Sequence, residues 1–382
     1  MRLKLLVASL ATATFALPVL AQKHPDQADV LGHYAQLVYA TYTDAASSAL
    51  SLKVAIDDFV NAPSEAGLVE ARKRWRAARE WYGQSEAFRF YGGPIDGDEG
   101  PEGRINGWPM DEAYVDSVQG HAEAGIINDP SVKLDADTLI ALNEKEGEEN
   151  ISTGWHAIEF LLWGQDLRTD GPGDRSWTDF VDVKAPNADR RRAYLQIVTD
   201  LLVADLQDLS LAWAPGAQNY RAQFVSDPTS LNKLISGLGT LSRAELAGER
   251  MEVALDSQSQ EDEHSCFSDN THRDIVANAL GIRNVWRGEF ERADGSVLKG
   301  PSVYALVAIH NPELADKLDA QLDASVRAAE AIPAPFDQSI LAGTAGRAKI
   351  EATVVALKQQ TGTLAQAAQV LGIKHLNTAL PD

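Results

Sequence analysis

The chain contains a single cysteine, Cys266, in 382 residues. One cysteine excludes an intramolecular disulfide even in an oxidising compartment. Basic side chains are also scarce, because 34 lysines and arginines stand against 55 aspartates and glutamates. The resulting formal charge of -21 repels nucleic-acid phosphates and favours cationic partners such as metal ions. We therefore expect no nucleic-acid partner and a fold stabilised by its hydrophobic core.

Long apolar runs are confined to the N-terminus. Arg2 and Lys4 precede an apolar stretch, residues 5–20, and small residues follow in Val19-Leu20-Ala21. This order of charge, apolar run and small residues is typical of a cleaved signal peptide. No later segment reaches the ~18 uninterrupted apolar residues of a membrane span. We expect residues 1–21 to be a signal peptide, with export of the mature protein to the periplasm.

Alternating strand patterns are also scarce, whereas helical periods dominate. Apolar side chains recur every three or four residues over 34–59, 194–213 and 350–371. Further helices are expected at 66–91, 240–256, 272–288 and 311–331. One stretch, Ala293-Asp294-Gly295-Ser296, predicts the turn of a short hairpin instead.

Two loops rich in glycine, proline and acidic residues, 92–109 and 166–186, interrupt the first half of the chain. The second loop leads into a long helix that ends before Pro215-Gly216, so the domain change is expected within 215–240. The prediction is a mainly α fold of two helical-bundle domains, residues 22–225 and 226–382, with a short hairpin.

The first chemical motif lies in GWHAIEFLLWG, residues 154–164, which is predicted to be helical. His156 and Glu159 are three residues apart, so imidazole and carboxylate share one helix face and can bind one cation. Ser152 or Thr153 can cap the helix, which places His156 in the first turn and favours its neutral form. The alternative is a polar pair that hydrogen-bonds locally.

A polar stripe precedes this motif. Helical spacing relates five residues, Trp75, Arg79, Tyr82, Glu86 and Arg89. One helix face thus carries two arginines and a glutamate where a core stripe would be apolar. The stripe is either a solvated face with Arg–Glu pairs or an inward polar face with Glu86 as a ligand.

The third cluster, residues 261–274, reads EDEHSCFSDNTHRD and holds five acidic side chains and two histidines. This density suits hard or borderline cations, although the spacing is not that of a calcium loop. A solvated acidic loop is the alternative. Upstream, Ser242 and Glu245 form a capping-box pattern, which gives Glu245 a structural role that Glu249 and Arg250 lack.

These sequence segments resemble those of the imelysin-like family. The resemblance rests on GWHAIEFLLWG, which fits the GxHxxE signature, on ARKRWRAAREWYGQSEAFRFYGGPID before it, and on LSRAELAGERM and QEDEHSCFSDNTHRD after it. It spans nearly the whole chain after the signal peptide. It implies a helical periplasmic protein of two bundle-like domains, implicated in iron uptake, with the signature on Gly154, His156 and Glu159 near the domain interface.

We predict a metal site, with iron as the expected ion and zinc as the alternative. The expected ligands are His156, Glu159 and Glu86. The second half is expected to close the site through one or more of Glu249, Asp262, His264, Asp269 and His272. The side chains expected around the ligands are Arg79, Tyr82, Arg89 and Trp155.

Three functions fit this site. The first is an iron-binding component of an uptake system, with a metal ion or iron chelate as cargo and an inner-membrane or periplasmic iron-transport partner. The second is a metallopeptidase, a label that the family has also carried. The inverted zincin motif His-x-x-Glu-His is incomplete here, because Phe160 follows Glu159. The third is a metal-free scaffold that docks a partner protein.

Overall fold

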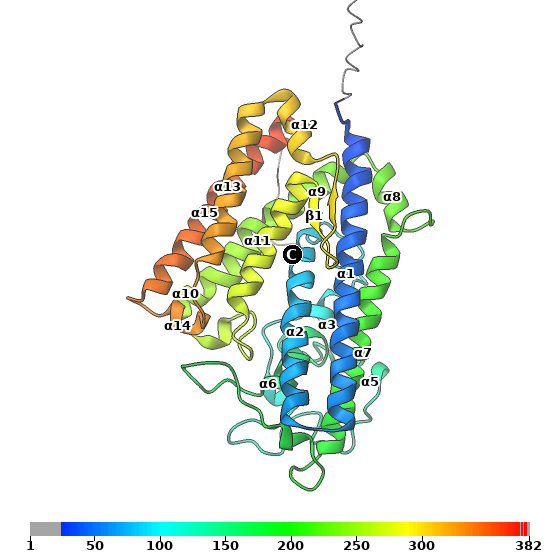
Figure 1. Cartoon of the computed structure of the whole chain (residues 1–382), viewed down its shortest axis with the longest axis vertical. Coiled ribbons are helices and arrows are strands. Elements are labelled where there is room, and N and C mark those ends of the chain that lie inside the picture. Colours follow the sequence, from blue (N-terminus) through cyan, green and yellow to red (C-terminus); the bar gives the residue numbers. More distant parts are fainter. Residues whose placement is uncertain (1–23, 375, 377, 380–382) are drawn as a thin grey trace, which may run out of the picture.

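The computed structural model describes residues 24–374, 376 and 378–379. The predicted signal peptide, residues 1–21, and its cleavage site lie outside them. Within this part of the chain the fold is mainly α-helical, as predicted, and the only strands form a two-stranded hairpin (Figure 1). None of the helices there is long and apolar enough to cross a membrane.

Three long helices form the frame of the first half. α1 (Gln27–Asn61) packs along both α2 (Glu65–Ser85) and α7 (Ala188–Ala212), and the three run side by side (Figure 1). The apolar stripe predicted for α1 is buried from Tyr34 to Phe59, because the helical period places it on one face. A short 3-10 turn, η1 (Glu86–Phe88), continues α2.

Shorter helices and long loops pack around this frame. They are α3 (Glu102–Asn106), α4 (Glu112–Val115), α5 (Ala136–Leu142), α6 (Gly154–Trp163), η2 (Trp177–Phe180) and α8 (Tyr220–Ser226). α6 carries the GxHxxE signature, and every one of its residues is buried. Apart from His156 and Glu159, α6 is apolar on all sides, and such a helix belongs in the interior.

The second half begins with a continuous helical stretch. α9 (Ser230–Thr240) runs directly into a π-helix, η3 (Leu241–Glu252), and then into α10 (Val253–Ser257). The predicted capping box was therefore wrong, because Ser242 lies inside the helix and not at its start. Its hydroxyl instead accepts a hydrogen bond of 2.9 Å from the side-chain amide of Gln360.

Three further helices complete the second bundle, α11 (Thr271–Arg287), α13 (Pro312–Glu330) and α15 (Ala345–Val370). Two short helices, α12 (Val303–His310) and α14 (Phe336–Ile340), flank α13. The predicted hairpin is confirmed, with β1 (Glu289–Glu291) antiparallel to β2 (Val297–Lys299) and Phe290 opposite Leu298.

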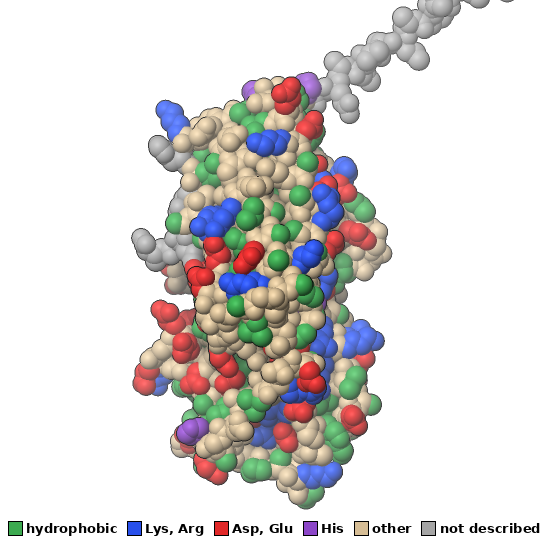
Figure 2. All heavy atoms as spheres, turned by 90° about the vertical axis from the view of Figure 1, so that its left-hand side faces the viewer, with side chains coloured by type: hydrophobic (Ala, Val, Ile, Leu, Met, Phe, Trp, Pro, Cys, Tyr) green, Lys and Arg blue, Asp and Glu red, His purple; other side chains and the backbone are tan. Residues whose placement is uncertain are grey.

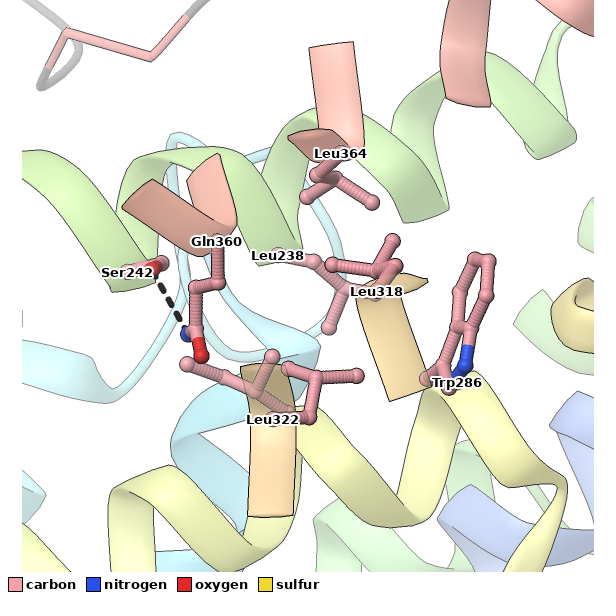
Figure 3. A pocket seen from close by; sticks show the side chains of 8 residues that line it. Leu238, Ser242, Trp286, Leu318, Leu322, Gln360 and Leu364 are labelled. Atoms are coloured by element: carbon pink, nitrogen blue, oxygen red, sulfur yellow. Dashed lines mark hydrogen bonds between the residues drawn. The ribbon is translucent and has the colours of Figure 1, made fainter. Parts of the chain in front are cut away.

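The core of the second bundle encloses a cavity of about 10 Å³ (Figure 3). Leucines from α9, α13 and α15 surround it, and Trp286 of α11 closes one side. This volume corresponds to about one water molecule. The side of the molecule on which α13 and α15 lie carries interspersed charges, with acidic side chains gathered along one edge below mid-height (Figure 2).

The two halves are in close contact through α2 and α11. A Cβ atom added at Gly83 of α2 would lie 2.7 Å from the Cβ of Ala277 in α11. One added at Gly281 would lie 2.3 Å from the carbonyl oxygen of Gln84. Small residues thus let the two backbones approach, and the candidate site lies along this contact. The boundary predicted after residue 225 falls at the end of α8.

Candidate metal centre

The glycine of the signature has a structural role. Gly154 adopts a φ of 84°, a left-handed conformation that disfavours other residues. A Cβ atom there would also lie 2.4 Å from the carbonyl oxygen of Ile105 in α3. Thr153 precedes it at the N-cap position, but its hydroxyl donates to the Arg104 carbonyl and does not cap α6. The start of α6 is thus held against α3, with His156 in its first turn.

His156 and Glu159 share one helix face, as their spacing predicts. Both side chains are buried, and Nδ1 of His156 lies 2.9 Å from Oε2 of Glu159. The other oxygen of Glu159, Oε1, accepts hydrogen bonds from the amide and hydroxyl of Ser268, at 2.9 and 2.6 Å. Across the described part of the chain, Nε2 of His156 has no hydrogen-bond partner. It is the one ring nitrogen left for a ligand.

Burial sets the protonation of this pair. Burial, reinforced by the charge of Arg79, lowers the pKa of His156 well below its ordinary value. Burial raises the pKa of Glu159 to about 8, although the hydrogen bonds from Ser268 act in the opposite direction. The imidazole is therefore neutral near pH 7 and able to bind a metal ion.

The polar stripe faces inward. Oε2 of Glu86 accepts from Arg89 at 2.8 Å and from Arg250 of η3 at 2.7 Å. Burial alone would raise the pKa of Glu86, but the charges of Arg89 and Arg250 outweigh it and lower the pKa. In the described residues Oε1 of Glu86 has no partner. Glu86 thus remains charged, with one oxygen unused.

The π-helix explains how Arg250 is positioned. Its guanidinium also binds Glu245 at 2.8 Å and Asn278 at 2.6 Å. In a π-helix, whose hydrogen bonds span five residues, side chains five apart lie on one face. The wide turn therefore aligns Glu245 with Arg250 and directs both toward the first half.

A second buried ion pair joins the halves. Both side chains of the Arg79–Asp274 pair are about 1% exposed, and Nη2 lies 3.1 Å from Oδ2. Arg79 also donates to Asn106 at 2.6 Å. Its guanidinium carbon lies 5.5 Å from the ring centre of Tyr82 and 5.6 Å from that of Trp155. Three of the side chains expected around the ligands, Arg79, Tyr82 and Trp155, thus lie together here, and the fourth, Arg89, contacts Glu86.

His264 is the second-half candidate that reaches the signature. Its ring centre lies 4.9 Å from that of His156, and its Nδ1 lies 3.2 Å from Oδ2 of Asp274. Burial, followed by the charge of Arg250, lowers the pKa of His264 to about 3. Two neutral imidazoles therefore stand edge to face at the junction of the halves.

The other second-half candidates lie farther out. Glu249 is exposed, whereas Asp262, Asp269 and His272 are half-buried. Nδ1 of His272 lies 3.1 Å from the carbonyl oxygen of Asp269, within its own loop. Across residues 24–374, 376 and 378–379, no three His, Cys, Asp or Glu side chains are grouped closely enough to hold a metal ion. The ligand set of His156, Glu159 and Glu86 therefore stays a prediction.

First-half residues hold the main chain of the 261–274 loop. The indole of Trp108 donates to the Glu263 carbonyl at 2.6 Å, and Arg76 donates to the Ser268 carbonyl at 2.8 Å. The amide of Gly173 donates to the Phe267 carbonyl at 3.0 Å. These contacts fix the loop against α6, where Ser268 reaches Glu159.

A pocket of about 540 Å³ opens between the halves beside these residues. His264 and Arg250 line it from the second half, and Asn106 and Trp108 line it from the first. His156 does not line it, but its ring packs directly against that of His264. The pocket thus leads from the surface to the residue that covers the signature histidine.

Sequence reasoning missed four residues of this centre, which are Asn106, Arg250, Ser268 and Asp274. Arg250 could have been identified from the sequence, because its charged side chain had no capping role. Ser268 and Asp274 lie within the acidic cluster 261–274, but nothing in the sequence separated them from its exposed members. Asn106, in a glycine-rich loop, carried no signal.

Comparison with known proteins agrees with this architecture. A family model described as Imelysin matches residues 38–364. The "Iron-regulated protein A" of Synechococcus elongatus is 28% identical over 347 residues, which cover 88% of this chain and 83% of that protein. A crystal structure from Parabacteroides distasonis, described as an iron-regulated protein A precursor, aligns with a TM-score of 0.69. It covers 93% of this chain and 98% of its own at 20% identity, which shows a shared fold.

Proposed function

Because the chain belongs to the imelysin family, we propose that it is a periplasmic protein that binds iron at the junction of its two halves. The relative from Synechococcus elongatus is named for its regulation by iron, which supports iron as the cargo. The strongly acidic composition supports a cation as the ligand. An iron-transport partner in the periplasm or inner membrane would receive the cargo.

One observation carries the proposal, the unpartnered Nε2 of His156. A buried polar atom without a partner costs about 1–3 kcal/mol, so such atoms need an explanation. Near pH 7 burial favours the protonated form of Glu159, so metal binding would release that proton. With Glu159 ionised, Nδ1–H donates a hydrogen bond to it and Nε2 presents a lone pair, the arrangement by which carboxylates orient metal-binding histidines. Glu159 then acts mainly by orienting the imidazole, since Ser268 already occupies its other oxygen.

Glu86 is the second donor in this proposal. Its Oε1 is buried and, in the part of the chain described, lacks a partner. Imidazole nitrogen together with carboxylate oxygen suits ferrous iron, and it also suits zinc. Water molecules would complete the coordination, because His156 and Glu86 supply only two ligands. Arg89 and Arg250 would keep Glu86 ionised for this role.

Calorimetric titration under anaerobic conditions tests the proposal. We expect ferrous iron, supplied from a weak chelator, to bind at one site. Replacing His156 with alanine should abolish detectable binding, and Glu159→Gln should weaken it by about 10–100-fold, the usual effect of losing an orienting partner. His310→Ala is the matched control, because His310 is an exposed histidine at the end of α12.

If folded His156→Ala protein binds ferrous iron with unchanged affinity, the proposed site is refuted, whatever amount of iron the protein contains. Parallel titration with zinc decides between the two ions. A zinc affinity well above the ferrous one would make zinc the cargo.

Export gives a separate prediction. Cleavage after Ala21 should leave a mature protein that begins at Gln22, because Val19-Leu20-Ala21 is the small-residue site that ends the apolar run. Intact mass spectrometry of protein recovered from the periplasm measures this directly. A mass that includes residues 1–21 would mean that the segment is retained.

Peptidase activity remains the alternative function. It needs three ligands, an open water position and a general base. The position after Glu159, where an inverted zincin has its second histidine, holds the buried Phe160. We therefore expect no metal-dependent cleavage of an unfolded protein substrate, and cleavage that His156→Ala removes would favour the enzyme. If the protein is instead a metal-free docking scaffold, none of the metal titrations should show binding.

A further inference from the structure

Glutamates dominate the walls of the 540 Å³ pocket between the halves. Both halves contribute them, and they are Glu102, Glu144, Glu148, Glu245 and Glu249. A pocket lined by one sign of charge raises the local concentration of the opposite sign. The composition of the walls thus bears on which form of iron can enter.

The two arginines of the pocket offset only part of this negative charge. Arg89 binds Glu102 at 3.0 Å and Glu86 at 2.8 Å, and Arg250 binds Glu86 and Glu245 at 2.7 and 2.8 Å. Each guanidinium is thus shared between two carboxylates. The arginines consequently offer no free positive charge to an anionic ligand.

Three glutamates of the mouth remain uncompensated. Glu144, Glu148 and Glu249 are exposed and, within the described ranges, make no ion pair. Burial raises the pKa of Glu249, and the neighbouring charge of Glu245 adds to this effect. A cation at the mouth would relieve this repulsion.

The interior adds buried donor atoms for a metal ion, which an acidic surface alone would lack. Behind the pocket wall, Nε2 of His156 is buried without a partner within the described residues, as is Oε1 of Glu86. A cation with six water molecules needs roughly 200 Å³, since each water takes about 30 Å³ in the liquid. The pocket therefore has room for a hydrated ion on its way to these donors.

From this arrangement we infer that the pocket is the entry route to the site, and that it admits iron as a hydrated cation and rejects anionic chelates and haem. The inference rests on the proposed iron site and specifies its cargo. Citrate complexes and the two propionates of haem carry negative charge, which the glutamates repel. Exclusion by like charge is a common source of specificity.

Stopped-flow fluorescence can test this route, because Trp108 packs against His264 and reports on the pocket. The probes are ferrous sulfate under anaerobic conditions, ferric citrate and haemin. We expect ferrous ions to bind at a rate that falls steeply with ionic strength, since salt screens exposed charges. We expect neither ferric citrate nor haemin to change the fluorescence at equal concentrations.

The triple variant Glu144→Gln, Glu148→Gln and Glu249→Gln tests the contribution of the three charges at the mouth of the pocket. Association of ferrous ions should slow by about tenfold and lose most of its salt dependence, while dissociation changes less than twofold. The control triple replaces three exposed glutamates elsewhere, Glu65, Glu313 and Glu330, with glutamine. It removes the same charge and should associate like the wild type.

The outcomes separate this inference from the proposed function. If His156→Ala loses ferrous binding but the mouth variant associates like the wild type, the entry route is wrong and the site stands. Binding of ferric citrate or haemin as tight as that of ferrous ions would also overturn the inference. If His156→Ala binds like the wild type, the proposed site itself fails.

Discussion

Replacing Asp274 with alanine should lower the free energy of unfolding by about 3–5 kcal/mol. The substitution leaves the guanidinium of Arg79 buried and about 1% exposed, without its carboxylate partner. Asp274 also accepts hydrogen bonds from Ser265 and Asn270, and His264 lies beside it. The loss thus affects both the ion pair and the loop that covers the signature.

Urea unfolding followed by tryptophan fluorescence measures this change. The matched control is Glu351→Ala, which breaks the solvent-exposed pair with Arg347 and should cost no more than about 1 kcal/mol. The double variant Arg79→Met with Asp274→Leu should recover part of the loss, since it leaves no buried charge unpaired. A loss below 1 kcal/mol for Asp274→Ala would contradict the importance of this pair.

We also expect a large effect of pH on the free energy of unfolding, with the protein most stable at mildly acidic pH. Burial raises the pKa of Asp166 to about 6, and it raises those of Asp269 and Glu112 to about 7. In each case the folded state holds a proton that the unfolded state releases at lower pH. Their contribution to stability is complete below the ordinary carboxyl pKa of about 4 and is lost as pH rises through 6 and 7.

Other groups cause the loss of stability at low pH. The folded pKa of His264 is about 3, because burial favours its neutral form. Between its ordinary value of about 6.5 and 3, the unfolded state binds a proton that the folded state does not. For Asp116, burial acts to raise the pKa, but the contacts of Arg191 and Arg175 lower it to about 2. Stability from Asp116 is therefore lost as pH falls below about 4 toward 2.

Urea midpoints measured from pH 3 to pH 8.5 should trace this curve. We expect a maximum near pH 4 to 5, a decline as pH rises through 6 and 7, and a steep decline below about pH 4. The variants Asp166→Asn and Glu112→Gln should flatten the decline on the alkaline side, because amides do not titrate. Stability that keeps rising up to pH 8 in the wild type would contradict the assignment.

The helices were predictable because their periodicity is local. The stripe over 34–59 sets the buried face of α1 regardless of what packs against it, and Pro63 explains why the helix ends near Asn61. The misassigned capping box shows the limit of such signals. Ser242 and Glu245 have the right spacing, but α9 already runs into them, and no local feature of four residues reveals that the helix began earlier.

The site was predictable only where its geometry comes from one helix. The spacing of His156 and Glu159 fixes their contact within α6. The partners that decide their chemistry come from far along the chain, since Ser268 binds Glu159 and Arg250 binds Glu86. Pairings of this kind depend on how α2, α6, α11 and η3 pack, which residue spacing does not encode.

The loop 261–274 is held to the first half through side chains such as Asp274 and also through its own main chain, at the carbonyls of Glu263, Phe267 and Ser268. A carbonyl oxygen is the same whichever side chain its residue carries. Point substitutions in the loop should therefore accumulate readily during evolution wherever the side chain itself is not used. An inserted or deleted residue would shift every carbonyl out of register, so loop length should diverge far more slowly than loop sequence among related chains.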